Sequence, residues 1–367
     1  MFGNIVGVLL SILIFILYDF LKDDSEDNKV DSPDTEEFPE TEEVPEIEEV
    51  PETEEVEEIA ITDQAWKELE EVHGVDRGDS RTWNKHFLGP DGVRGYVRTT
   101  GSKARFNLKE VAPRAFQAQV DIVGGVDKLM AGDALAWSNN AIGNLGGFGT
   151  TEWETPSPKQ RGWHKDGWHF RHFLNSPEQG LLTVPILTDI LPQSGGTFMA
   201  VDSVNPVARF LSEHPEGLHP DSVQGAGYLI PGLIEQCERY EELTGEAGDV
   251  AILHPFMLHR VCANPSTRPR FIQNVAVQLK QPMQFARSDE NYSLVELATL
   301  NTLELARFEY RQTNPMLASV PFPVRDDETK KKEKVVLQSE MRTMAANGVV
   351  TPSWGVDQGY ESNQSYA

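Results

Sequence analysis

Residues 163–172 read Trp-His-Lys-Asp-Gly-Trp-His-Phe-Arg-His and contain a His-x-Asp pair, His164 and Asp166. Side chains alternate between the two faces of an extended strand, so these two would point the same way. An imidazole and a carboxylate on one face supply two of the three ligands of a 2-His-1-carboxylate site, which holds Fe(II) and leaves coordination positions open. The pair alone is weak evidence in a chain with nine histidines, so a third ligand is required.

A candidate for the third ligand lies downstream, at the end of an apolar stretch. Residues 250–259 follow a Gly-Asp turn, have β character and end at His259. Arg270 follows eleven residues later, after a segment rich in turn formers, and 271–277 again resembles a strand. We therefore expect a hairpin with His259 on one arm and Arg270 on the other. A guanidinium near an open iron site suits a dicarboxylate co-substrate, whose far carboxylate it can bind through two hydrogen bonds.

The order His164-x-Asp166, His259, Arg270 resembles the phytanoyl-CoA dioxygenase family, and the resemblance covers about residues 108–300. The supporting segments are 162–167, 195–198 and 254–259. The resemblance implies a mostly β protein with flanking helices (α+β). Its centre would be a double-stranded β-helix, also called a jelly roll or cupin-like fold, with a helical buttress.

The same resemblance implies an Fe(II)- and 2-oxoglutarate-dependent dioxygenase. His164, Asp166 and His259 would hold the iron, and Arg270 would pair with the C5 carboxylate of 2-oxoglutarate. The implied partners are O2 and a small or lipophilic substrate that is hydroxylated with release of succinate and CO2, and ascorbate can serve as a reductant. Asp166 favours hydroxylation, because the related halogenases lack this carboxylate and accommodate chloride instead. Fatty acyl, terpenoid, small-metabolite and peptide substrates all stay open.

Several residues compete with this interpretation. His169 and His172 have the spacing of a zinc pair on a helix, although no Cys or Glu partner pattern lies nearby, and His254 is a further competing histidine. Arg268 competes with Arg270, and the spacing favours Arg270. The alternative function is a catalytically inactive jelly-roll binding protein that retains the metal site.

The amino-terminal end of the chain is apolar. Residues 1–18 carry no charged side chain, and 5–17 consist almost wholly of Leu, Ile, Val and Phe. About 20 apolar residues span a bilayer as a helix. We therefore expect a membrane anchor over 1–21 and a single-pass protein of an endomembrane, with the side of the catalytic domain left open. A cleaved signal peptide and a buried helix are the alternatives, but no basic n-region or small-residue cleavage site is visible.

A strongly acidic repeat follows. Residues 22–58 hold 19 acidic residues and two lysines, and a six-residue unit that begins with Glu-Glu recurs from residue 36. Like charges repel and prolines hold the chain extended, so we expect a disordered linker over 22–60, with loose cation binding as the alternative. The linker accounts for most of the net charge of −26, and this charge argues against a nucleic-acid partner.

The remaining sequence predicts one oxygenase domain over 61–310 and a solvated carboxyl-terminal tail over 311–367. Helices are predicted near 63–73, 107–123, 205–212 and 231–243, and strands near 135–137 and 180–190. Pro185 would place the last of these strands at a sheet edge or a bulge.

A glycine-rich segment, 143–147, is predicted to form a turn. It lacks the Gly-Lys-Ser/Thr ending of a phosphate-binding loop. Asn140 and Asn144 within or beside this segment are candidate cofactor contacts, with ordinary turn residues as the favoured interpretation.

Overall fold

The fold is known from a computed structural model. The residues that it describes are 54–83, 93–101, 104–132, 134–146, 152–167, 170, 172–215, 217 and 232–312, with only the backbone for 54–60. The expected anchor over 1–21, most of the expected linker and nearly all of the expected tail lie outside these residues.

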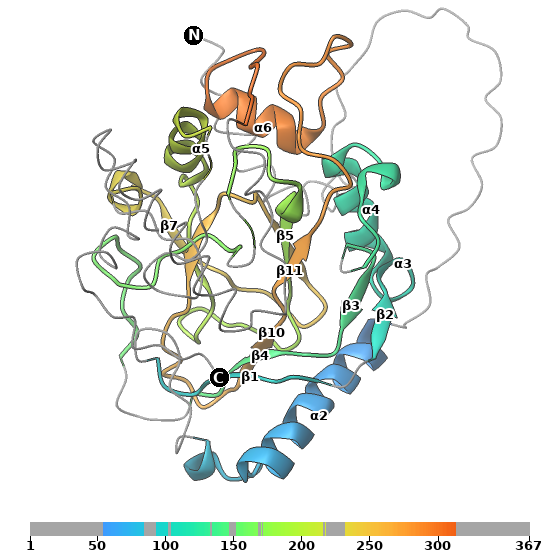
Figure 1. The fold of residues 1–367 in the computed structure, drawn as a ribbon. Helices are drawn as coiled ribbons and strands as arrows, with labels where there is room; N and C mark the ends of the chain where they lie inside the picture. The colour runs from blue at the N-terminus through green and yellow to red at the C-terminus, as the bar shows by residue number, and fades with distance from the viewer. Residues whose placement is uncertain are drawn as a thin grey trace, which may run out of the picture.

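Among the described residues, the largest antiparallel sheet combines two sets of three strands (Figure 1). The first set has the order β1-β4-β10 and the second the order β11-β5-β8. Their bounds are β1 (Tyr96–Arg98), β4 (Ile142–Asn144), β10 (Arg270–Ile272), β11 (Val275–Val277), β5 (Leu181–Pro185) and β8 (Val250–Leu253). A bridge between Ile186 and Ile272 joins the two sets. The joined sheet therefore runs β1-β4-β10/β11-β5-β8.

The smaller sheet has the order β7-β6-β9, with bounds Tyr240–Glu242, Phe198–Ala200 and Leu258–Arg260. A bridge between His164 and His259 adds the His-x-Asp segment beside β9. A separate antiparallel pair joins β2 (Arg105–Asn107) to β3 (Ala136–Ser138). The protein is thus mostly β with flanking helices, a double-stranded β-helix of the jelly-roll type whose antiparallel sheets do not close, as the sequence predicted.

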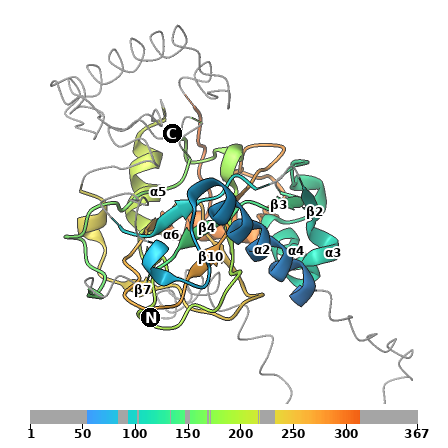
Figure 2. The same cartoon turned by 90° about the horizontal axis from the view of Figure 1, so that it is seen from below.

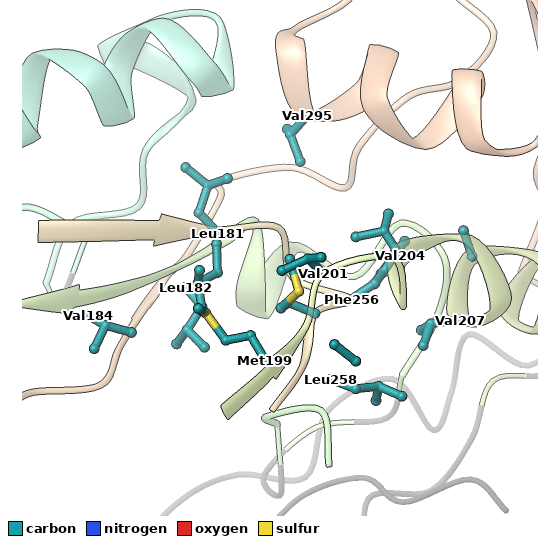
Figure 3. Close-up of a cluster of buried hydrophobic side chains, with 14 of the residues drawn as sticks. Leu181, Leu182, Val184, Met199, Val201, Val204, Val207, Phe256, Leu258 and Val295 are labelled. Carbon is teal, nitrogen blue, oxygen red and sulfur yellow. The ribbon is translucent and has the colours of Figure 1, made fainter. Parts of the chain in front are cut away.

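The core lies between the two sheets. Leu182 of β5, Met199 of β6 and Leu258 of β9 are each at most 4% exposed and belong to one cluster. Figure 3 shows these side chains in one cluster, with Val295 of helix α6 above it and Val204 of helix α5 beside it. Burial of a side chain of this size contributes about 1.5–3 kcal/mol, so this cluster fixes how the sheets face each other.

The helices of the described residues lie around the sheets: α2 (Glu54–His73), α3 (Leu108–Val111), α4 (Pro113–Val123), α5 (Val204–Glu213) and α6 (Leu294–Thr302). Short 3-10 turns are η1 (Ser80–Thr82), η3 (Val126–Lys128), η4 (Pro177–Gln179) and η5 (Ile234–Gln236). The helical prediction over 107–123 is confirmed as α3 and α4. Asn107 caps α3 through its side chain, Pro113 starts α4, and Gly124 ends α4 in the left-handed region at φ 83°.

Helix α2 covers the face of the larger sheet that points away from the core (Figure 2). The Trp66 ring meets the Phe271 ring edge-on at 5.4 Å and the Trp83 ring at 5.7 Å. A Cβ on Gly143 would lie 2.7 Å from Val97 and 2.9 Å from Phe271, so a strand glycine is required under this helix. The helix begins at Glu54, earlier than predicted and inside the range assigned to the linker, and its apolar side chains from Ile61 onward pack on the sheet.

We expect Phe271→Ala to lower the free energy of unfolding by about 3–5 kcal/mol, because Phe271 is 0% exposed and its loss would leave a cavity under α2. Urea denaturation followed by circular dichroism measures this change. Val72→Ala is the control: Val72 is 67% exposed, so its loss should change stability by no more than about 0.5 kcal/mol. Equal effects of the two substitutions would contradict the packing of α2 on the sheet.

The expected hairpin between His259 and Arg270 is wrong. Strand β9, which carries His259, pairs with β6 in the smaller sheet, whereas β10, which carries Arg270, pairs with β4 in the larger sheet. Residues 261–269 therefore cross from one sheet to the other. Turn-forming residues mark a change of direction, but they do not specify which strand is the partner.

Three local predictions also need correction. Residues 231–243, predicted helical, hold the turn η5 and then β7, because Tyr240–Glu242 pairs with β6. Pro185 is neither at an edge nor at a bulge: it is the last residue of β5, a strand paired on both sides. Gly143 and Asn144 belong to β4 rather than to a turn, since partners on both sides supply their backbone hydrogen bonds.

The described residues contradict the expected single-pass membrane localisation. Among the residues that the structure describes, no helix has the length and apolar character needed to cross a bilayer. The segment 1–21 itself, on which the expectation was based, lies outside those residues.

Candidate metal centre

Three potential metal ligands, drawn from distant parts of the chain, converge between the sheets. One ligand atom each from His164, Asp166 and His259 lies within 4.8 Å of the other two. The backbones of the two histidines exchange hydrogen bonds of 3.0 and 2.9 Å, so their side chains share one face. Asp166 lies two residues beyond His164 and returns to that face. Within the described part of the chain, this is the one such group of His, Cys, Asp or Glu.

Both imidazoles are oriented by backbone carbonyls. Nδ1 of His164 lies 2.7 Å from the Gly162 carbonyl oxygen, and Nδ1 of His259 lies 3.1 Å from that of Met257. A carbonyl only accepts, so each Nδ1 carries the hydrogen and each Nε2 presents a lone pair in the neutral ring. Nε2 of His259 is buried and has no hydrogen-bond partner. A buried nitrogen without a hydrogen-bond partner, close to a carboxylate, suits coordination of a cation.

The carboxylate lies between the two rings. Asp166 Oδ1 is 3.6 Å from Nε2 of His164, and Oδ2 is 3.6 Å from Nε2 of His259. Burial alone would raise the pKa of Asp166, but the charge of His259 and the neighbouring His164 hold it well below its usual range. Burial lowers the pKa of His164 to about 4, and the charge of His259 adds to this. Burial opposes protonation of His259 as well, but Asp166 raises its pKa. A cation that binds here would displace that proton.

Asn274 supports the carboxylate, and sequence analysis missed it. Its Nδ2 donates to Asp166 Oδ2 at 2.7 Å and so fixes one of the two oxygens. Asn274 follows Arg270 by four residues and so shares its strand face. This four-residue spacing is the sequence feature from which Asn274 could have been predicted.

We expect Asn274→Ala to weaken metal affinity about 10- to 100-fold, the usual cost of losing a group that orients a ligand. Competition titration of Fe(II) or Co(II) against a chelator measures this change. Asn140→Ala is the control, because the exposed Asn140 amide only accepts from the Ser138 hydroxyl. Unchanged affinity in Asn274→Ala would remove this residue from the centre.

Lys165 points to the opposite side of the His-x-Asp segment. Its Nζ donates to Nδ1 of His172 at 2.8 Å, while Nε2 of His172 donates to the Gly167 carbonyl oxygen at 2.6 Å. Burial lowers the pKa of Lys165 to about 7. Gly167 has φ 118°, and a Cβ there would lie 2.5 Å from the Phe170 ring. These contacts hold the turn that follows Asp166.

The competing zinc interpretation finds no support. Both ring nitrogens of His172 are used by Lys165 and Gly167, so neither is available to a metal. His169 lies outside the described residues. His254 is a buried structural residue whose Nε2 lies 3.2 Å from the Thr299 hydroxyl and whose Nδ1 accepts from the Phe256 backbone N–H.

Burial lowers the pKa of His254 to about 3 from an ordinary value of 6.5. Between these values the unfolded chain binds the proton and the folded chain does not. The free energy of unfolding should therefore fall as pH decreases through this window, by up to about 1.4 kcal/mol per pH unit for this group. We expect His254→Gln to flatten the slope measured by urea denaturation between pH 7 and 4. An identical slope in both proteins would contradict this assignment.

Arg270 is the largest charged group in the interior and is 2% exposed. Its Nε and Nη2 donate to the Gly195 carbonyl oxygen at 2.9 and 2.7 Å, and its Nη1 is buried with no partner. Burial lowers the pKa of Arg270. No carboxylate of the described residues lies within ion-pair distance of it. Burying a cation without a paired carboxylate costs free energy, so an external anion beside Arg270 would stabilise it.

The other residues considered as co-substrate contacts differ in burial. Asn144 lies directly opposite Arg270 in the sheet and is 0% exposed, with its Oδ1 buried and without a partner. It therefore faces the same space as Arg270, which the turn interpretation did not anticipate. Asn140 is exposed and behaves as a turn residue, and the Arg268 side chain is exposed on the surface.

No family model matches the sequence, and no curated protein matches it. Among solved structures, AviO1 from Streptomyces viridochromogenes Tue57 is similar over 64% of this chain and 87% of its own, with 14% identity and a TM-score of 0.36. SnoK, an alpha-ketoglutarate-dependent carbocyclase from nogalamycin biosynthesis, is similar over 64% and 78%, with 12% identity and a TM-score of 0.31.

The nickel complex of ThoJ, a non-heme monooxygenase, is similar over 80% of this chain and 91% of its own, with 12% identity and a TM-score of 0.31. The similar structures thus include non-heme and alpha-ketoglutarate-dependent enzymes. The resemblance to phytanoyl-CoA dioxygenases in particular is not confirmed by them. At such low identity and TM-score, only this chain's own geometry can support a function.

Proposed function

We propose that this protein is an Fe(II)- and 2-oxoglutarate-dependent dioxygenase of the phytanoyl-CoA dioxygenase type. It would hydroxylate a small or lipophilic substrate with release of succinate and CO2. The observation that carries the proposal is the convergence of His164, Asp166 and His259, with both imidazoles oriented to present Nε2.

The donor set suits Fe(II). Two imidazole nitrogens and one carboxylate on one side of an ion leave the remaining positions open, which is the arrangement of non-heme Fe(II) oxygenases. A structural zinc site would instead need four protein ligands, and the described residues offer three. The unpartnered Nε2 of His259 would be satisfied by the ion.

Arg270 would receive the co-substrate. The free Nη1 of Arg270 is a buried donor without an acceptor, and an arginine fork binds a carboxylate through parallel hydrogen bonds. Arg270 and Asn274 lie four residues apart on one strand line, which is roughly 13 Å. The two side chains and a five-carbon diacid can bridge that separation, so the C5 carboxylate would meet Arg270 while the other end chelates the metal.

When bound, Fe(II) with 2-oxoglutarate supplies oxygen activation and oxidation of a C–H bond. The protein contributes positioning and a dry environment. Asn274 holds the Asp166 carboxylate, and the carbonyls of Gly162 and Met257 hold the two rings. Ile142 and Ile272 lie between Arg270 and Asn274 on the same face of the sheet, are at most 9% exposed and keep water from the reacting groups.

Anaerobic ultraviolet–visible titration tests the proposal. Addition of Fe(II) and 2-oxoglutarate should produce a metal-to-ligand charge-transfer band, and admission of O2 with ascorbate present should yield succinate. The alternative, a jelly-roll binding protein that retains the metal, predicts metal binding without succinate. Absence of both the band and metal binding would overturn both functions.

A further inference from the structure

Arg98 lies on the face of the larger sheet that looks towards the metal centre. The register places Tyr96, Asn144 and Arg270 in one row across β1, β4 and β10. Arg98 begins the next row, opposite Ile142, which in turn pairs with Ile272. Facing residues of paired strands point to the same side. Strands lie about 4.8 Å apart, so Arg98 is about 10 Å across the sheet from Ile272.

The Arg98 side chain is held by its neighbour on the same strand. Its Nε donates to the Tyr96 hydroxyl at 2.7 Å, and the Tyr96 ring packs against the main core. Arg98 therefore lies at the open edge of the sheet, since β1 is the outermost strand, and on the face that also carries Asn144 and Arg270.

Within the part of the chain that the structure describes, the Arg98 guanidinium pairs with no acidic residue. No carboxylate of the described residues pairs with it, although acidic residues outnumber basic ones in this chain by 58 to 32. Its guanidinium carbon lies 5.8 Å from the Tyr96 ring centroid. Because Tyr96 uses only Nε, the two terminal nitrogens remain available for a bidentate oxyanion.

We propose that Arg98, oriented by Tyr96, binds an oxyanion group of the substrate, a carboxylate or a phosphate, at the mouth of the metal centre. This inference rests on the proposed function, because it places the substrate beside the same ion. The substrate is then an anionic molecule whose reacting C–H bond lies near the metal while its charged end stays at the sheet edge. Arg270 remains assigned to the co-substrate. The buried Arg270 would therefore bind 2-oxoglutarate, and Arg98 at the sheet edge would bind the substrate.

Two small probes, methyl phosphate and acetate, test the proposal without the true substrate. The full chain without metal is mixed with excess 2-oxoglutarate, which occupies Arg270, and probe binding is followed by 31P and 1H line broadening. We expect saturable binding of at least one probe, and the probe that binds more tightly shows whether the site prefers phosphate or carboxylate. Arg98→Gln should raise the Kd for that probe about 10-fold or more, since hydrogen bonds to charged groups contribute about 1.5–3 kcal/mol. Tyr96→Phe should raise the same Kd less.

Arg209→Gln is the matched control, because it removes the same charge from a guanidinium that Glu304 already pairs at 3.0 Å. Its Kd should equal that of the wild type. No saturable binding of either probe, or equal Kd values in Arg98→Gln and wild type, would overturn the proposal.

A second measurement on the same samples locates the probe relative to the metal. It also distinguishes failure of the Arg98 proposal from failure of the proposed oxygenase function. Mn(II) is added, and its binding is read by electron paramagnetic resonance. If Mn(II) binds, it should strongly enhance the relaxation of the bound probe; lack of enhancement would place the anion elsewhere and overturn the proposal. If Mn(II) does not bind, the proposed function fails, while the metal-free comparison still decides whether Arg98 binds the anion.

Discussion

Asp166→Ala should abolish succinate production while the protein stays folded. The carboxylate is the one negative charge between two imidazoles, 3.6 Å from each Nε2. Removing a ligand should cost more than the 10- to 100-fold typical of losing a supporting group. The Asp166 side chain is 21% exposed, so its truncation leaves little buried void. Succinate assay, Fe(II) titration and far-ultraviolet circular dichroism measure the three parts of this prediction.

Asp189→Ala is a suitable control for this experiment. Asp189 is also an aspartate whose carboxylate accepts one hydrogen bond, from the Ala247 backbone N–H at 3.1 Å, but it lies in an exposed connection outside the metal centre. Its loss should leave succinate production unchanged. Turnover at the wild-type rate in Asp166→Ala would remove Asp166 from the site, and loss of the folded signal would mean that the residue is structural.

Arg270→Ala should raise the Kd for 2-oxoglutarate roughly 30- to several-thousand-fold, because truncating one partner of a buried, hydrogen-bonded charge pair costs about 2–5 kcal/mol. Arg270→Lys should recover only part of the affinity, since an ammonium keeps the charge but lacks the planar fork. Arg270→Met keeps the aliphatic volume and so separates loss of packing from loss of charge. Anaerobic titration of the charge-transfer band gives the Kd in each case.

Arg268→Ala provides the matched comparison, because Arg268 is two residues away and exposed. Its 2-oxoglutarate affinity should be that of the wild type. The reverse result, with Arg268→Ala impaired and Arg270→Ala intact, would show that the buried guanidinium serves the fold and that the co-substrate binds at the surface.

The two predicted effects differ in how they should respond to metal. Asp166→Ala should lose the ion itself, whereas Arg270→Ala should still bind Fe(II), because none of the three ligands touches Arg270. Measuring metal and co-substrate affinities on both variants therefore distinguishes a defect at the ion from a defect at the far carboxylate.

The sequence by itself determined the residue types of the proposed metal ligands and the shared face of His164 and Asp166. Strand periodicity is a local property, so His164 and Asp166 could be assigned to one side without knowledge of the fold. The same holds for the helix signals at Asn107, Pro113 and Gly124, which act within one turn. The four proposed site residues, His164, Asp166, His259 and Arg270, were named from local patterns and from the resemblance, which also implied the mostly β architecture.

Only the tertiary structure decided which strands are neighbours. His259 and Arg270 were expected on one hairpin, but they lie on β9 and β10 in different sheets. Tyr240–Glu242, inside a predicted helix, form a strand because β6 is beside them. Pairing across a sheet depends on non-local burial, which no local pattern encodes. For the same reason Asn274 became visible as a partner of Asp166, and Arg98 as a residue on the same face of the sheet, only when the register of the sheets was known.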